Sequence, residues 1–82
     1  MKKILIVVYV LFLENEYDIL LPINISVLEA IELIQTSVCE LSGNTYIIND
    51  NAVLYDAYGK VININNIVKF SGLKNGSKVI LV

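Results

Sequence analysis

The sequence of 82 residues predicts an α+β fold in which one helix packs against a mixed sheet of four to five strands. Two observations carry this prediction. A capping motif at residues 26–29 opens a segment with helical apolar spacing, and short apolar segments flank that segment in a β-β-α-β-β-β order. A chain of this length buries one core and not two, so we expect residues 1–82 to form a single domain.

The first two strands are expected to form a hairpin. Residues 3–12 are rich in valine, isoleucine and aromatic side chains, a polar turn follows, and residues 17–21 lead to Pro22. Two lysines before ten apolar residues are also typical of a secretion signal, so membrane contact or export stays the alternative for residues 4–13. Ten residues are too few to span a bilayer as a helix, which favours a strand.

The helix has the clearest signals. Ser26 and Glu29 have the spacing of a capping box, and Gly43 is suited to end a helix that runs to about residue 40. The apolar residues between these limits recur at helical spacing and are expected to face the sheet: Val27, Ala30, Ile31, Ile34, Val38 and Leu41.

The second half of the chain predicts three further strands, at residues 53–55, 60–62 and 78–82, and a short extended piece at residues 46–48. Glycines at positions 59 and 76 mark turns between them. The segments 4–12 and 79–82 are the most apolar, so we expect them to lie side by side and parallel in the centre of the sheet.

Composition excludes several classes of function. The net charge is −2 and all six basic residues are lysines, which argues against nucleic-acid binding. There is no histidine and one cysteine, so the chain cannot form a Cys/His zinc site or an internal disulfide. We expect Cys39 to be an inert small side chain and the carboxylates to lie on solvated faces. No catalytic residue, metal site or cofactor is therefore predicted.

Several segments resemble ubiquitin. Residues 59–62 (Gly-Lys-Val-Ile) resemble the turn into its fourth strand, and residues 75–81 (Asn-Gly-Ser-Lys-Val-Ile-Leu) resemble its closing strand. Val68 and Leu73 have the spacing of the two buried anchors of its short 3₁₀ segment, and residues 19–22 resemble its second strand. The resemblance implies a ubiquitin-like β-grasp fold.

Within that fold, residues 17–22 (Tyr-Asp-Ile-Leu-Leu-Pro), which lead into the apolar helix, resemble the YukD-like or EsaB-like proteins. These are small ubiquitin-like proteins that accompany type VII (WXG100/Esx) secretion systems in Gram-positive bacteria. Residues 70–72 (Phe-Ser-Gly) depart from the Asp-Tyr pair common there. The resemblance implies a non-catalytic bacterial adaptor in the cytoplasm, at the periphery of a membrane secretion complex, with secretion-machine components as partners.

The sequence stops at Val82 without the terminal Gly-Gly that ubiquitin-type conjugation and sulfur transfer use, so we expect neither activity. The alternative is a small carrier or a subunit of an enzyme system related to the sulfur-carrier β-grasp proteins.

Both alternating sets of side chains in the first strand are apolar, so one set is expected to lie on the face of the sheet that the helix leaves open. We assign to this protein-interaction surface Ile6, Val8, Val10, Phe12, Ile80, Tyr55 and Tyr58. A partner protein or a second copy in a homodimer would cover it. The alternative is that residues 42–51, with Tyr46, Ile47 and Ile48, fold back over this face. No nucleic acid and no direct membrane insertion are expected.

Overall fold

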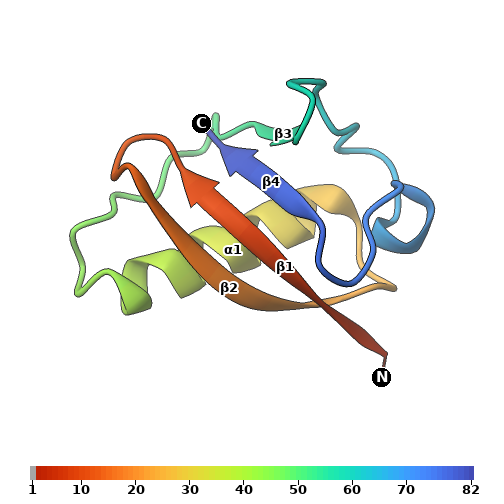
Figure 1. Cartoon of the computed structure of the whole chain (residues 1–82), viewed down its shortest axis with the longest axis horizontal. Coiled ribbons are helices and arrows are strands. Elements are labelled where there is room, and N and C mark those ends of the chain that lie inside the picture. Colours follow the sequence, from red (N-terminus) through yellow and green to blue (C-terminus); the bar gives the residue numbers. More distant parts are fainter. Residues whose placement is uncertain (1) are drawn as a thin grey trace.

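The computed structural model describes residues 2–82, which form a four-stranded sheet with one helix across one of its faces (Figure 1). The elements follow in the order β1 (Lys3–Val10), β2 (Asn15–Pro22), α1 (Val27–Leu41), β3 (Leu54–Asp56), the 3₁₀ helix η1 (Val68–Phe70) and β4 (Lys78–Leu81). The strands lie side by side as β2-β1-β4-β3, and only the central pair β1 and β4 is parallel. The predicted α+β class and the central parallel pair are confirmed.

Local capping starts α1 where the sequence predicts. The Ser26 hydroxyl oxygen accepts a 3.1 Å hydrogen bond from the Glu29 N–H, and the same hydroxyl lies 3.2 Å from Oε1 of Glu29. Beyond the helix, Gly43 has φ +65°, a left-handed conformation that glycine adopts without strain. Of the predicted apolar face, all members except Leu41 are buried against the sheet.

The pairing of β1 with its neighbours decides which of its faces meets the helix. Ile6 lies opposite Ile19 of β2, and Val8 lies opposite Val79 of β4. The alternate side chains of β1 point to the other face and lie beside charged residues, because Val7 lies between Asp18 and Lys78. If this second face of β1 were buried under the helix, the neighbouring charges of Asp18 and Lys78 would be buried with it, at a large cost in free energy.

The assignment of Ile6, Val8 and Val10 to an exposed surface is therefore wrong. These side chains are fully buried in the core under α1. Phe12 was expected to continue the strand, but β1 ends at Val10, and Phe12 lies in the turn to β2 with 75% of its surface exposed.

The strand predicted at residues 60–62 is reduced to a single bridge between Tyr55 and Val61. The backbone N–H of Ile62 donates to the Leu54 carbonyl at 2.9 Å, and the Asp56 N–H donates to the Lys60 carbonyl at 2.8 Å. Asp56 Oδ1 in turn accepts hydrogen bonds from two backbone N–H groups of the turn at residues 58–60. The tight turn leaves room for one bridge, so the sheet has four strands.

The segment after α1 is tied to the helix by Gln35, a buried polar side chain. The Tyr46 hydroxyl donates to Gln35 Oε1 at 2.8 Å, and the Asn49 N–H donates to the same oxygen at 2.7 Å. Gln35 Nε2 donates to the Asn49 carbonyl at 3.0 Å. Burial raises the pKa of the Tyr46 hydroxyl above its ordinary value.

These bonds place Tyr46 in the core beside α1. Ile47 and Ile48 remain exposed. The alternative in which residues 46–48 fold back over the open face of the sheet is therefore wrong, because the segment is anchored on the helix side.

The 3₁₀ helix η1 fastens the connection between β3 and β4 to the entry of α1. The Val68 N–H donates to the Ile25 carbonyl, and the Lys69 N–H donates to the Ile23 carbonyl, both at 2.9 Å. Val68 is buried and Leu73 is partly buried against the core, as the resemblance to ubiquitin implies. No helix within residues 2–82 has the length and apolar character needed to cross a bilayer.

Candidate functional site

The sheet face opposite α1 carries a band of apolar side chains that crosses all four strands. In register, Leu5 lies opposite Leu20, Tyr9 lies opposite Ile80, and Ile80 lies opposite Tyr55. The isolated bridge between Tyr55 and Val61 extends the band to Val61, beyond β3. We call the set the open-face patch: Leu5, Val7, Tyr9, Leu20, Tyr55, Val61 and Ile80.

The open-face patch is only partly shielded from solvent. Leu20 is 59% exposed and Leu5 is 38% exposed, whereas Val7, Tyr9 and Ile80 are half-buried by their neighbours in the sheet. Neighbouring apolar side chains that lie together on an open sheet face favour burial against another protein surface. Tyrosine suits such a surface because its ring packs while its hydroxyl stays hydrated.

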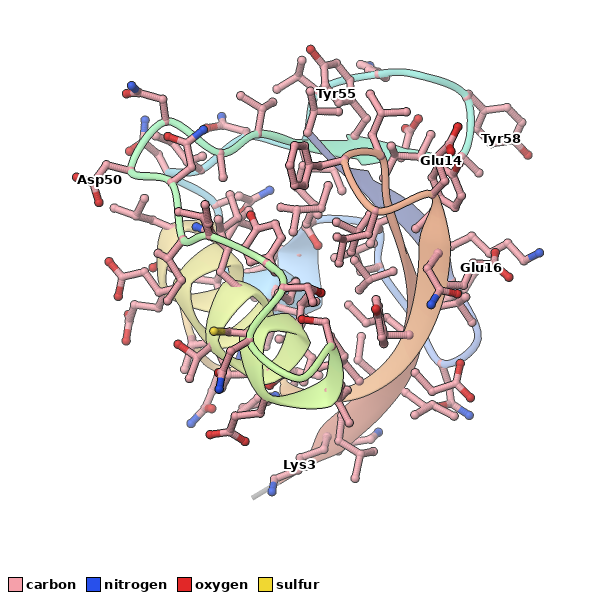
Figure 2. All side chains as sticks on the ribbon, turned by 90° about the vertical axis from the view of Figure 1, so that its left-hand side faces the viewer. Lys3, Glu14, Glu16, Asp50, Tyr55 and Tyr58 are labelled. Atoms are coloured by element: carbon pink, nitrogen blue, oxygen red, sulfur yellow. The ribbon has the colours of Figure 1, made fainter. Side chains whose placement is uncertain are left out.

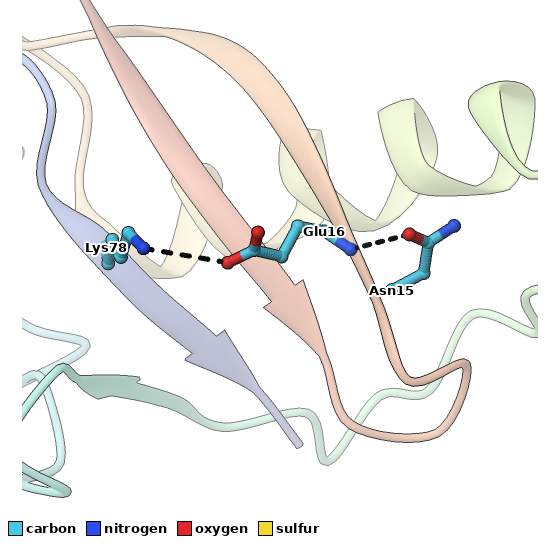
Figure 3. Close-up of polar contacts among 3 residues, drawn as sticks. All are labelled: Asn15, Glu16 and Lys78. Carbon is cyan, nitrogen blue, oxygen red and sulfur yellow. Dashed lines mark hydrogen bonds and ion pairs between the residues drawn. The ribbon is translucent and has the colours of Figure 1, made fainter.

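Charged side chains interrupt the patch along β1. Glu16 lies opposite Tyr9 on one side, and Lys78 lies opposite Val7 on the other. Their side chains reach across β1, with Lys78 Nζ 4.0 Å from Glu16 Oε2 (Figure 3). Both side chains are more than half exposed, so the ion pair contributes little to folding. Figure 2 shows Glu16 pointing away from the side of the sheet that carries α1.

The structure brings together only part of the surface predicted from the sequence. Ile80 and Tyr55 lie on the open face as neighbours. Tyr58 lies in the turn after β3, and 96% of its surface is exposed. Sequence reasoning missed Leu5, Val7, Tyr9, Leu20 and Val61. The signal that could have identified the first four is the alternation of β2, where Glu16 and Asp18 share one face with Leu20.

The chemistry of this face suits non-covalent contact. Its polar groups are Lys3, the exposed ion pair, Asp18 and the two tyrosine hydroxyls. Elsewhere, Cys39 is half-buried with Sγ 3.5 Å from Asn44 Oδ1. Residues 2–82 hold no group of three side chains placed to ligate a metal ion.

The sequence matches no protein-family model and no curated protein. Its structure is similar to the ubiquitin-like domain of the Mycobacterium tuberculosis type VII secretion protein EccD1, with a TM-score of 0.73 and 14% identity over 100% of this chain and 99% of that one. A Caldiarchaeum subterraneum ubiquitin gives a TM-score of 0.67 and 15% identity over 98% and 91% of the two chains.

A third similar structure is a chain of the MycP5-free ESX-5 inner membrane complex. Its TM-score is 0.72 with 12% identity, over 100% of this chain and 21% of that one. Similarities at such low identity establish the fold alone. One helix against a four-stranded mixed sheet, together with these similarities, shows that the chain has the α+β ubiquitin-like fold.

Proposed function

We propose that this protein is a non-catalytic, ubiquitin-like protein-interaction module that binds a partner through the open-face patch. The observation that carries the proposal is the apolar band from Leu20 across β1 and β4 to Val61, which no other element within residues 2–82 packs against. Charged side chains along it, Glu16, Asp18 and Lys78, would orient the partner.

We further propose that the partner belongs to a type VII secretion machine, so that the protein acts as its accessory at the cytoplasmic side. Two observations support this assignment. The fold resembles a ubiquitin-like domain of one type VII protein and a chain of one ESX-5 membrane complex. Residues 17–22, which resemble the YukD-like segment, form most of β2 and place Leu20 on the open face.

Site-specific photocrosslinking in the native host tests both statements. A photoreactive phenylalanine analogue replaces Leu20 or Tyr55 on the open face, and the same analogue at Phe70, an exposed residue of η1, serves as the matched control. We expect crosslinks to secretion-machine proteins from the first two positions and not from the third. Crosslinks from Phe70 alone would overturn the use of the open face, and crosslinks from the patch to proteins outside the secretion machine would overturn the partner class.

A further inference from the structure

The charges of this chain are segregated along the sequence. All eight acidic residues lie between positions 14 and 56, and all six lysines lie at positions 2–3 or between 60 and 78. The fold gathers five of the acidic residues on two neighbouring elements, with two on β2 and three on α1. Neither element carries a lysine, so their side of the molecule is acidic. The basic groups beside it are Lys3, opposite Pro22, and Lys78, which pairs with Glu16.

This acidic side includes a strand edge with free backbone groups. On β1, the Val7 and Leu11 N–H groups donate toward β4, and the Leu5 carbonyl accepts from Gly76 on the same side. Because the odd-numbered residues of β1 direct their backbone groups toward β4, its even-numbered residues direct theirs toward β2. Their partners there are odd-numbered residues, such as Ile19 opposite Ile6, so the odd-numbered residues of β2 hold the hydrogen bonds to β1. It follows that the backbone groups of Asp18 and Leu20 point away from the sheet.

At the opposite edge of the sheet, the outer backbone groups of β3 are not free in this way, because residues 60–62 form hydrogen bonds to that strand. On β2, the Glu16 N–H is occupied by Asn15 Oδ1 at 2.9 Å (Figure 3), and Pro22 has no N–H. Within residues 2–82, nothing accepts from the N–H groups of Asp18 and Leu20, and no strand lies beyond β2 (Figure 1). Such an edge is a template for another strand.

A groove flanks the end of β2 on its helix side. Its volume is about 450 Å³, and it runs between Pro22 and the exposed side of α1. Ile25 and Leu33 give it an apolar floor, and three carboxylates surround it: Glu29, Glu32 and Glu40. A strand added to β2 would place alternate side chains in this groove and the others beside Glu16 and Asp18 on the open face.

We propose that the free edge of β2 binds an extended segment of a partner protein that carries lysine or arginine at alternate positions. Asp18 and Leu20 donate and accept the backbone hydrogen bonds. Glu16 and Asp18 attract the basic side chains on the open face, and apolar side chains between them enter the groove beside Leu33. The site shares only Leu20 with the open-face patch, and it adds a second, strand-like mode of contact.

The occupant is a different protein and not a second copy. Among the four strands within residues 2–82, β2 has the long free edge, so a second copy would offer its own β2. Pairing β2 with β2 would bring Glu16 and Asp18 of one copy against the same carboxylates of the other, and like charges across a strand pair are destabilising. A basic segment reverses the sign of that interaction.

A peptide of seven residues with lysine at alternate positions and valine between them provides the probe. We expect it to bind at low salt and to weaken as salt is added, with binding followed by fluorescence anisotropy. Slowed hydrogen exchange at the Asp18 and Leu20 N–H groups should accompany binding. The same peptide with glutamate in place of lysine should not bind. N-methylation of the peptide backbone on the edge facing β2 should weaken binding by about two- to tenfold for each hydrogen bond lost.

Variants of the protein separate the contribution of the backbone hydrogen bonds to binding from that of the carboxylate charges. Leu20→Pro removes the free N–H without touching a bond to β1, and Leu20→Ala keeps that N–H as the control. Asp18→Asn and Glu32→Gln should each weaken binding, whereas Asp50→Asn, the same charge change on the loop before β3, should not.

Three results would overturn the proposal. These are no binding of the lysine peptide, equal binding of the glutamate or N-methylated peptides, and an equilibrium dimer of the free protein that Leu20→Pro abolishes. Circular dichroism shows whether Leu20→Pro still folds, and the N-methylated peptide decides the question if it does not. Crosslinks from Tyr55 in the host would still support the open face if the peptide failed.

Discussion

The hydroxyl of Tyr46 donates a 2.8 Å hydrogen bond to Oε1 of Gln35, joining the loop after α1 to the middle of the helix. Both side chains are buried, and Gln35 is the one polar residue in the buried set of residues 2–82. Its carboxamide also exchanges two hydrogen bonds with the backbone of Asn49. This one side chain therefore sets the path of the segment that leads to β3.

Removing the two partners should have unequal effects. Tyr46→Phe deletes one hydrogen bond and leaves Gln35 Oε1 bonded to Asn49, so we expect a loss of about 0.5–1.5 kcal/mol in the free energy of unfolding. Gln35→Leu leaves the Tyr46 hydroxyl and the Asn49 backbone unpaired, and we expect a loss of about 1–3 kcal/mol for each group that stays buried. Urea denaturation measures both. Equal losses would show that water replaces the missing carboxamide.

The raised pKa of Tyr46 predicts a pH dependence with a definite sign. Below the ordinary tyrosine pKa of 10.0 the hydroxyl is protonated in both the folded and the unfolded chain, and the stability is unaffected. Above that value the unfolded chain releases the proton before the folded chain does, so the free energy of unfolding falls as pH rises. Tyr46→Phe should reduce the slope above about pH 10. An unchanged slope would assign the loss to other groups.

Leu5 and Ile6 are adjacent in β1 but lie on opposite faces. Ile6 is fully buried under α1, and Leu5 lies in the open-face patch. Ile6→Ala should cost about 2–5 kcal/mol of stability because it leaves a cavity in the core. Leu5→Ala removes a partly exposed side chain and should cost clearly less. Thermal or urea unfolding of the two variants checks the orientation of β1, and the reverse order of losses would contradict it.

Ser26 caps the N-terminus of α1, so replacing it should cost stability that a different capping residue can supply. Ser26→Ala removes the acceptor for the Glu29 N–H and should cost about 1 kcal/mol in stability. Ser26→Asp supplies another acceptor at the helix N-terminus and should retain most of the stability. Denaturation of both variants tests this, and equal losses would show that the cap is not what stabilises the start of α1.

Elements specified by neighbouring residues were predictable from the sequence. The start of α1 depends on Ser26 and Glu29, three positions apart, and its buried face follows from helical spacing. The hairpin of β1 and β2 and the parallel β1–β4 pair were also recognised, because their segments are long or strongly apolar. The central strands β1 and β4 carry few charged residues, so few other orders of the strands in the sheet would bury them as well.

Features that depend on distant residues needed the tertiary structure. Both faces of β1 are apolar, so the sequence alone could not say which one is buried; the register with Asp18 and Lys78 decides it, because those charges must stay in water. The burial of Gln35 depends on Tyr46 and Asn49, which lie 11 and 14 positions away. The free edge of β2 exists only because the chain pairs that strand on one side, so its backbone groups could be identified only after the strands were in place.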